Sequence, residues 1–196
     1  MPDITDWAPY IAFTSGNAPR PLHQAALSYF TEPGTAVDLG CGAGNETLDL
    51  LDRGWQVHAV DSSPAALAEV SRRAGDRPGL TLEHSDLWNA QPPVADLVHA
   101  GFSLFFAPPE RFAETWAVVT RSVRPGGIFA GQLLGVRDDW ARQPEISAQD
   151  DAEVRALLDG WSVERLDEVE NDGRALSGPK HWHLYDVLAR RIRPGG

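Results

Sequence analysis

The residues with the clearest potential for chemistry are three closely spaced glycines that follow a short apolar run. They lie in the segment Asp38-Leu39-Gly40-Cys41-Gly42-Ala43-Gly44. Glycine lets a backbone approach a ligand closely and adopt positive φ. A helix that begins after such a turn adds unpaired N–H groups and a partial positive charge. The segment therefore predicts a turn that could hold a nucleotide-like ligand.

A carboxylate follows this turn at an informative distance. Asp61 comes 21 residues after Gly40, at the end of the next apolar run. A doubly wound fold places an acid there to bind ribose hydroxyls. The glycine spacing is G-x-G-x-G, and Asn45 stands where the dinucleotide fingerprint G-x-G-x-x-G needs its last glycine. The spacing disfavours NAD, but an NAD-linked oxidoreductase stays open as an alternative.

The elements that must position these residues alternate along the chain. Short apolar runs at 35–39, 55–60, 80–83, 95–100 and 128–134 are typical of buried strands, and the segments 45–53, 63–74 and 109–123 are typical of amphipathic helices. This alternation predicts a parallel, doubly wound sheet. The glycine turn then lies at the carboxyl ends of the strands, near the topological switch point, where such sheets bind their ligands.

The two ends of the chain have other patterns. Asp150 and Glu153 predict a capping box for a helix that reaches residue 158. Runs at 161–169 and 182–189 predict two antiparallel strands at the edge of the sheet, with a turn at 171–173. Residues 1–34, with a helix over 21–30, predict a helical lid on a domain that covers residues 35–193. We expect a single domain overall.

Several of these segments resemble the motifs of the class I methyltransferases that use S-adenosylmethionine (SAM). Residues 38–44 match the family's first motif, D/E-x-G-x-G-x-G, at every fixed position. Residues 57–64 and 83–87 resemble its second and third motifs, and Arg124-Pro125-Gly126-Gly127 resembles the turn before its fifth strand. The resemblance covers about residues 30–190. Residues 129–135 and 178–184 resemble, more narrowly, the small tellurite-resistance-type methyltransferases of bacteria.

The resemblance implies a fold, a cofactor and a set of binding residues. The implied fold is α/β, a Rossmann-like, doubly wound, seven-stranded sheet that is mostly parallel with an antiparallel C-terminal strand. The implied cofactor is SAM, which leaves as S-adenosylhomocysteine (SAH). The cofactor-binding residues that follow are Asp38, Gly40, Cys41, Gly42, Gly44, Asp61, Ser62, Asp86, Leu87 and Gly101.

The methyl acceptor is less well defined than the cofactor. SAM is already activated, so positioning and exclusion of water do much of the work, and the sequence assigns no catalytic side chain. Residues 100–106 lack the Asn/Asp-Pro-Pro motif of the family's amino-group methyltransferases, and their aromatic side chains predict an enclosed pocket for a small molecule. Candidate acceptor contacts are Arg20, Phe102, Arg137 and His183, although each arginine could equally be a surface residue.

Length and composition limit the remaining possibilities. The chain has 196 residues, one cysteine (Cys41) and a net charge of −11, which argues against a nonspecific nucleic-acid binder. No apolar run approaches the roughly 20 residues that cross a bilayer, and the N-terminus carries acids where a signal peptide carries lysines. We expect a cytoplasmic protein without a membrane partner. The oligomeric state is not predicted.

Two readings of the polar residues stay open. His181 and His183 share a strand face, but no Cys or carboxylate has supporting spacing, so no metal is predicted. Residues 138–172 hold twelve acids and three arginines. They are typical of a solvated surface, or they could form the interface of a non-catalytic SAM-binding module that acts through a protein partner.

Overall fold

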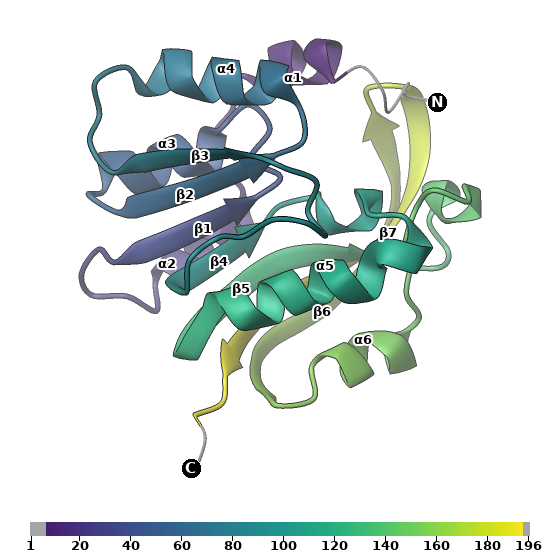
Figure 1. Ribbon diagram of the computed structural model, residues 1–196. Helices are drawn as coiled ribbons and strands as arrows, with labels where there is room; N and C mark the ends of the chain where they lie inside the picture. The colour runs from purple at the N-terminus through teal and green to yellow at the C-terminus, as the bar shows by residue number, and fades with distance from the viewer. Residues whose placement is uncertain (1–6, 194–196) are drawn as a thin grey trace.

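A seven-stranded sheet with helices on both faces forms the centre of the molecule (Figure 1). The computed structural model describes residues 7–193, so residues 1–6 of the predicted lid lie outside the described part of the chain. The strands are β1 Thr35–Leu39, β2 Gln56–Asp61, β3 Leu80–His84, β4 Ala95–Ala100, β5 Val123–Leu134, β6 Trp161–Ala175 and β7 Gly178–Arg191. The helices are α1 Ala8–Thr14, α2 Pro21–Leu27, α3 Asn45–Asp52, α4 Pro64–Ala74, α5 Pro109–Ser122 and α6 Asp151–Leu157, with short 3-10 turns η1 Leu104–Phe106 and η2 Asp139–Arg142.

The strand order confirms the predicted topology. It is β3-β2-β1-β4-β5-β7-β6. The first five of these strands pair in parallel, and β7 is inserted antiparallel between β5 and β6. The chain moves outward from β1 to β3 and then returns to β4, which lies on the other side of β1. The switch point therefore lies between β1 and β4, at the carboxyl ends of the parallel strands.

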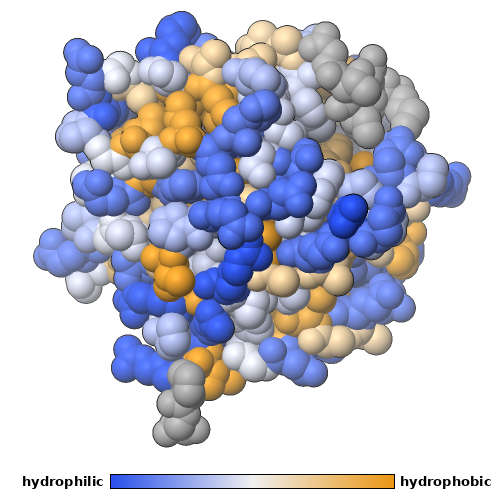
Figure 2. Space-filling view, in the orientation of Figure 1, coloured by the Kyte–Doolittle hydropathy of each residue, from blue (hydrophilic) through white to orange (hydrophobic). Residues whose placement is uncertain are grey.

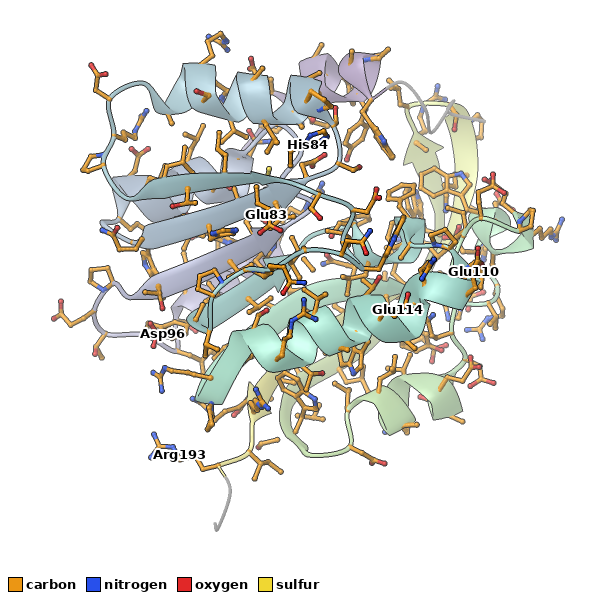
Figure 3. All side chains as sticks on the ribbon, in the orientation of Figure 1. Glu83, His84, Asp96, Glu110, Glu114 and Arg193 are labelled. Atoms are coloured by element: carbon orange, nitrogen blue, oxygen red, sulfur yellow. The ribbon has the colours of Figure 1, made fainter. Side chains whose placement is uncertain are left out.

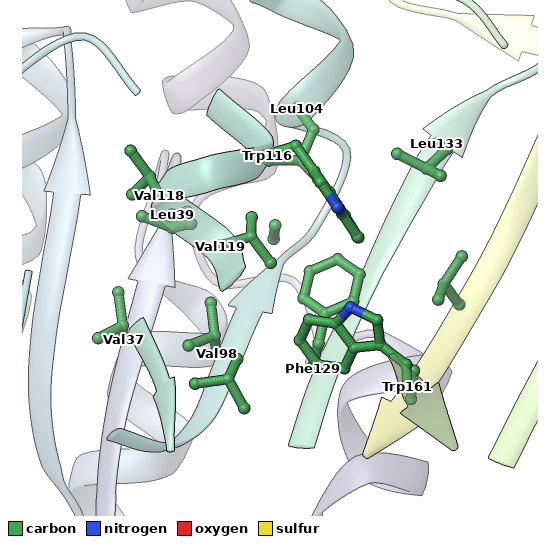
Figure 4. Close-up of a cluster of buried hydrophobic side chains, with 14 of the residues drawn as sticks. Val37, Leu39, Val98, Leu104, Trp116, Val118, Val119, Phe129, Leu133 and Trp161 are labelled. Atoms are coloured by element: carbon green, nitrogen blue, oxygen red, sulfur yellow. The ribbon is translucent and has the colours of Figure 1, made fainter. Parts of the chain in front are cut away.

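Alternating side chains bury the two faces of the sheet under different helices. Val37, Val98 and Phe129 pack with Trp116 of α5 and Trp161 of β6 on one face (Figure 4). Their sequence neighbours Ala36, Leu97 and Ile128 pack with α2 and α3 on the other face. This alternation follows from the two-residue period of a strand, and both faces are apolar because helices cover both.

Polar residues connect neighbouring strands at both ends of the sheet (Figure 3). At the amino ends, the Asp96 carboxylate accepts hydrogen bonds from N and Oγ1 of Thr35, both at 2.8 Å, and pairs with Arg124. At the carboxyl ends, His84 Nε2 lies 3.0 Å from the Ser62 carbonyl oxygen. These contacts join β1, β4 and β5 at their amino ends, and β2 and β3 at their carboxyl ends.

The predicted turn at residues 171–173 is wrong. Asn171 pairs with Trp182 and Gly173 with Lys180, and the chain reverses between Ala175 and Gly178. Most of β6 is exposed, because beyond the sheet edge the two strands pair only with each other. A two-stranded ribbon that covers no core does not need alternating apolar and polar residues. Its polar residues therefore resembled those of a loop. Residues 124–127, predicted as a turn before β5, lie inside that strand at an irregularity in its pairing with β4.

The surface agrees with the high charge of the chain. Figure 2 shows a largely hydrophilic face with apolar residues in separate patches. Within residues 7–193, no helix has both the length and the apolar character that crossing a membrane requires.

Candidate cofactor and acceptor site

The glycine turn joins β1 to α3, and each of its glycines has positive φ. A Cβ at Gly40 would collide with Ser103, whose Oγ donates to the Leu39 carbonyl. A Cβ at Gly44 would lie 2.6 Å from Cγ2 of Val70 on α4. A Cβ at Gly42 would meet no atom within 4 Å. Gly40 and Gly44 thus allow close packing of neighbouring elements, whereas Gly42 leaves open space for a ligand.

Four amides of the turn itself donate hydrogen bonds within the protein. Gly40 N and Cys41 N both donate to the Val60 carbonyl oxygen of β2, at 2.8 and 3.0 Å. Gly42 N donates to Asp61 Oδ2 at 2.8 Å, and Gly44 N donates to the Cys41 carbonyl. The neighbouring strand supplies acceptors that the sequence could not reveal. The turn is therefore preformed. It contributes to ligand binding mainly by leaving space for the ligand, and less by donating hydrogen bonds to it.

Asp61 is held in place by backbone amides on both sides. Its Oδ2 accepts from Gly42 N and its Oδ1 from Ser63 N, each at 2.8 Å. Burial raises the pKa of this carboxyl above its usual value, although these two hydrogen bonds oppose the shift. Each carboxylate oxygen keeps a further lone pair. The side chain can therefore accept hydrogen bonds from two neighbouring hydroxyl groups while its own orientation stays fixed.

A second buried carboxylate, Asp38, lies on the other side of the turn. It accepts from Thr47 Oγ1 at 2.6 Å and contacts His99 Nδ1 at 3.0 Å. Burial opposes ionisation, but the hydrogen bonds from His99 and Thr47 prevail, and the pKa of Asp38 lies below its usual value. His99 Nε2 is buried and has no hydrogen-bond partner within residues 7–193. Because Nδ1 faces a carboxylate, this nitrogen is the one that donates to Asp38.

A cavity of about 230 Å³ opens above the turn, which we call the glycine-turn cavity. Most of the predicted cofactor-binding residues line it: Asp38, Gly40, Cys41, Gly42, Asp61, Ser62, Asp86, Leu87 and Gly101. Gly44 does not, because it packs against α4. Burial, followed by the charges of Asp38 and Asp61, raises the pKa of the Cys41 thiol, so Cys41 is a passive part of the lining.

Glu46, Trp88 and His99 are among the lining residues that the sequence did not reveal. Glu46 lies in the first turn of α3, directly after the glycines, and Trp88 follows the predicted Leu87. His99 was expected to be an ordinary core residue of β4. Only the positions of Glu46 and Trp88 next to the motifs could have suggested these two residues. The lining includes four acids, Asp38, Glu46, Asp61 and Asp86, against one arginine, so it favours a cationic ligand.

A second, larger cavity of about 850 Å³ lies beside the first, and we call it the aromatic cavity. Eight aromatic residues line it: Trp7, Tyr10, Phe13, Phe102, Phe105, Phe106, Trp140 and Trp182. They come from α1, from the segment after β4, from η2 and from the β6–β7 hairpin, whose end rises toward α1 (Figure 1). Five residues of the predicted N-terminal lid line it: Trp7, Tyr10, Phe13, Asn17 and Arg20.

The two cavities share a wall of eight residues, in which Arg20 and Phe102 are prominent. The Arg20 guanidinium lies 4.5 Å from the centroid of the Phe102 ring and 3.8 Å from Glu46 Oε1. Phe102 has φ +57°, which is rare for a residue with a side chain. Its N–H donates to Gln132 Oε1 at 3.2 Å. The surrounding structure therefore fixes the ring at the junction of the cavities.

Two predicted acceptor contacts lie elsewhere. Arg137 and His183 line neither the glycine-turn cavity nor the aromatic cavity. His183 is fully buried beneath Gly135, accepts from Arg137 N at 3.1 Å, and contacts Glu168 through Nε2 at 2.8 Å. The Arg137 guanidinium pairs with Glu168 and Glu170, which raises its pKa. These side chains hold the loop after β5 against the hairpin, and sequence spacing could not show this pairing.

The same cluster has the spacing of a metal site. Glu168, Glu170 and His183 offer ligand atoms that lie within 4.8 Å of one another. The Arg137 guanidinium already pairs with both glutamates. The group therefore forms a closed set of ion pairs within this part of the structure.

Comparison with known proteins gives the family. A protein-family model described as a methyltransferase domain matches residues 36–127. A trans-aconitate 2-methyltransferase of Acidovorax sp. (strain JS42) is 35% identical over 194 residues, which cover 95% of this chain and 70% of that protein. Another, from Methylobacterium nodulans, is 33% identical over 66% of this chain. That alignment spans only 50% of the relative's own length.

Solved structures agree on the fold. TehB from Haemophilus influenzae superposes with a TM-score of 0.78 at 16% identity, over 95% of this chain and 67% of that protein. At this identity the match shows the fold alone, and the narrower tellurite-resistance-type resemblance stays a prediction; the sequence relatives are trans-aconitate 2-methyltransferases. With the seven-stranded sheet and the glycine turn, these matches show that the chain belongs to the class I SAM-dependent methyltransferases.

Proposed function

We propose that this chain transfers the methyl group of SAM to a small molecule that enters the aromatic cavity. The observation that carries the proposal is the shared wall: a ligand in the aromatic cavity directly adjoins the glycine-turn cavity. The family uses SAM and releases SAH, which excludes the NAD-linked alternative. The non-catalytic alternative is disfavoured because the sequence relatives are enzymes.

The residues of the glycine-turn cavity fit this cofactor. Asp61 would accept the two ribose hydroxyls, and Asp86 and Leu87 would contact the adenine. His99 Nε2, buried without a partner among the described residues, offers a polar contact to a ligand in this cavity. The open space at Gly42 would admit the backbone of the ligand, and the surplus of acids suits its positive charge.

Methyl transfer from SAM requires little chemical participation by individual side chains. Bound SAM supplies a carbon that accepts a lone pair from the acceptor while the electrons of the broken C–S bond stay on sulfur. This chain's residues would align the acceptor in line with that bond and exclude water, which are the main contributions available to a displacement of this kind. Phe102 and Arg20, at the shared wall, would contact the acceptor. We assign no catalytic base.

The N-terminal segment would complete the enclosure. Helix α1 packs against α4, and its aromatic residues line the aromatic cavity. We therefore propose that residues 1–34 act as a helical cover on the methyltransferase domain of residues 35–193.

The names of the relatives suggest one specific acceptor, a carboxylate of a tricarboxylic acid such as trans-aconitate. A carboxylate arrives already ionised, so its methylation would release no proton and would need no base.

Calorimetry with SAM and SAH tests the cofactor, and transfer of a labelled methyl group tests the reaction. We expect both ligands to bind the wild-type chain and the Asp61→Ala variant to bind them much more weakly. Labelled SAM and a small-molecule fraction of a bacterial extract should give a labelled small product. A folded protein that binds neither ligand would refute the proposal, and binding without any labelled product would favour the non-catalytic module.

A further inference from the structure

The rings of the aromatic cavity form one connected surface. The Trp7 and Phe106 ring centroids are 4.8 Å apart, those of Phe106 and Trp140 are 5.9 Å apart, and those of Trp140 and Trp182 are 5.3 Å apart. Phe102 continues the series, at 5.8 Å from Trp182. Aromatic rings favour edge-to-face or offset contacts with other flat rings at these separations. The surface is therefore better suited to a planar aromatic ligand than to a flexible polar one.

The charges of this cavity are few and unequal. Its charged lining residues are Arg20, Arg174 and Glu46. Arg20 already lies beside Glu46, whose Oε1 also accepts from Arg20 N at 3.1 Å. Arg174, near the end of β6, is exposed, and its guanidinium has no hydrogen bond or ion pair with any residue from 7 to 193. In a chain with a net charge of −11, it leaves one free cation at the mouth of an apolar cavity.

One free guanidinium matches one carboxylate, which it can bind through two parallel hydrogen bonds. A tricarboxylate would bring two more carboxylates against aromatic rings. Moving an ionised group out of water without a partner costs several kcal/mol. The lining therefore fits a ligand with one anionic group better than a ligand with three.

Building on the proposed function, we propose that the acceptor is a planar aromatic molecule that bears a single carboxylate. Its rings pack among Trp140, Trp182 and Phe106, and its carboxylate binds Arg174 at the mouth. The opposite end of the molecule then points to the shared wall at Phe102 and Arg20. The carboxylate is the anchor and not the methylated group, so the acceptor differs in chemistry from trans-aconitate.

The test uses 2-naphthoate, its uncharged analogue 2-naphthamide, and trans-aconitate as probes. Each is titrated by calorimetry into the full chain in the presence of saturating SAH. We expect 2-naphthoate to bind at least about tenfold more tightly than either other probe, which corresponds to one charge-assisted contact. The Arg174→Gln variant should lose this preference for the naphthoate over the amide.

Arg142→Gln is the matched control. Arg142 is also exposed, lines neither cavity, and makes no hydrogen bond or ion pair through its guanidinium within the described residues. It should bind all three probes as the wild type does. Tighter binding of trans-aconitate, or an unchanged preference in Arg174→Gln, would overturn the inference.

The design separates this inference from the proposed function. Binding of SAH is measured first, without any probe. If SAH fails to bind to folded protein, the proposed function fails. If SAH binds and 2-naphthoate does not, only the acceptor class fails. Retained SAH binding in Arg174→Gln shows that the variant is folded.

Discussion

Asp61 combines a raised pKa with a proposed role that requires its ionised form. Replacing it with Asn keeps the shape but removes the charge, and an amide cannot accept from both Gly42 N and Ser63 N. We expect affinity for SAH to fall about 10- to 100-fold, because hydrogen bonds to a charged group contribute about 1.5–3 kcal/mol. Calorimetry with SAH measures the change. Unaltered affinity would remove Asp61 from the cofactor site.

The pKa of Asp61 also predicts a pH dependence. Because burial raises this pKa above the usual value of 3.8, the carboxylate is lost at a higher pH than an exposed aspartate would be. A folded-state pKa above the unfolded value means that protonation of this group favours the folded chain. Affinity for SAH should therefore decline on acidification before the fold is lost. Titrations in which affinity and near-UV circular dichroism fall together would contradict this order.

Two variants of Phe102 test whether its positive φ strains the backbone. Phe102→Gly and Phe102→Ala both remove the ring, but only alanine still carries the cost of φ +57°. We expect the glycine variant to be more stable by about 1 kcal/mol, as measured by urea unfolding. At the neighbouring Ser103, where φ is −121°, alanine should be the more stable of the two. Equal stabilities at Phe102 would show that its backbone carries no strain.

Sequence could predict the chemically distinctive residues but not their partners. The glycine spacing and Asp61 were identifiable because the motif requires residues at fixed intervals along one chain. The partners of the turn amides come from β2, and the acidic partner of His99 comes from β1. Arg137 and His183 were predicted to reach a ligand because an arginine in a loop and a histidine on a strand are common at sites. Their long-range ion pairs became visible only in the fold.

The η2 segment is joined to the β6–β7 hairpin by a buried ion pair. Lys180 is 4% exposed, pairs with Asp138, and lies 3.6 Å from the centroid of the Trp182 ring. Asp138 also accepts from Trp140 N and His183 N, at 2.9 and 3.0 Å. These contacts hold Trp140 and Trp182, two of the three tryptophans of the aromatic cavity, in place.

Lys180→Met should destabilise the fold by about 3–5 kcal/mol, because it leaves a buried carboxylate without its counter-ion. Thermal and urea unfolding measure the loss. Arg165→Gln, which breaks the exposed pair with Asp167, should cost no more than about 1 kcal/mol. The double variant Lys180→Met/Asp138→Asn should recover part of the loss, because neither buried side chain is then charged. A small effect of Lys180→Met would mean that water reaches this pair.

The elements themselves were largely predictable. Buried strands with strict apolar patterns, such as β1 and β4, and capped helices, such as α6, were found because their packing sets the pattern directly. The capping box of Asp150 and Glu153 is present as predicted. The antiparallel pair of β6 and β7 was predicted over 161–169 and 182–189, but its extension to residues 175 and 178 was not, because these cross-strand pairs are polar and the Asn-Asp-Gly segment matches a turn equally well. Helix α2 ends at Leu27, earlier than predicted.

The aromatic cavity exists only at the level of the whole molecule. Its lining comes from α1, from the segment after β4, from η2 and from the hairpin, which are separated by long stretches of chain. No local pattern marks these residues as neighbours. Phe13 and Leu176 lie at its rim from opposite ends of the sequence, 65% and 47% exposed. Only the insertion of β7 beside β5 extends the hairpin over the carboxyl ends of the strands.

The overall charge predicts how the cofactor and its product should differ in binding kinetics. The net charge is −11, and four acids line the glycine-turn cavity. SAM carries one positive charge more than SAH and otherwise has nearly the same shape. The field of the protein should therefore accelerate association of SAM at low ionic strength and leave SAH almost unaffected.

Stopped-flow tryptophan fluorescence can follow both ligands, because Trp7 and Trp88 line the glycine-turn cavity. Between low salt and about 0.5 M salt, where charges are screened within several ångströms, the ratio of the SAM to SAH association rates should fall about three- to tenfold. SAH is the matched control, since any effect of salt on the fold acts on both ligands. A ratio that does not change with salt would mean that the acids of the cavity are neutralised locally, by Arg20 or by bound cations, and that the net charge has no influence on cofactor binding.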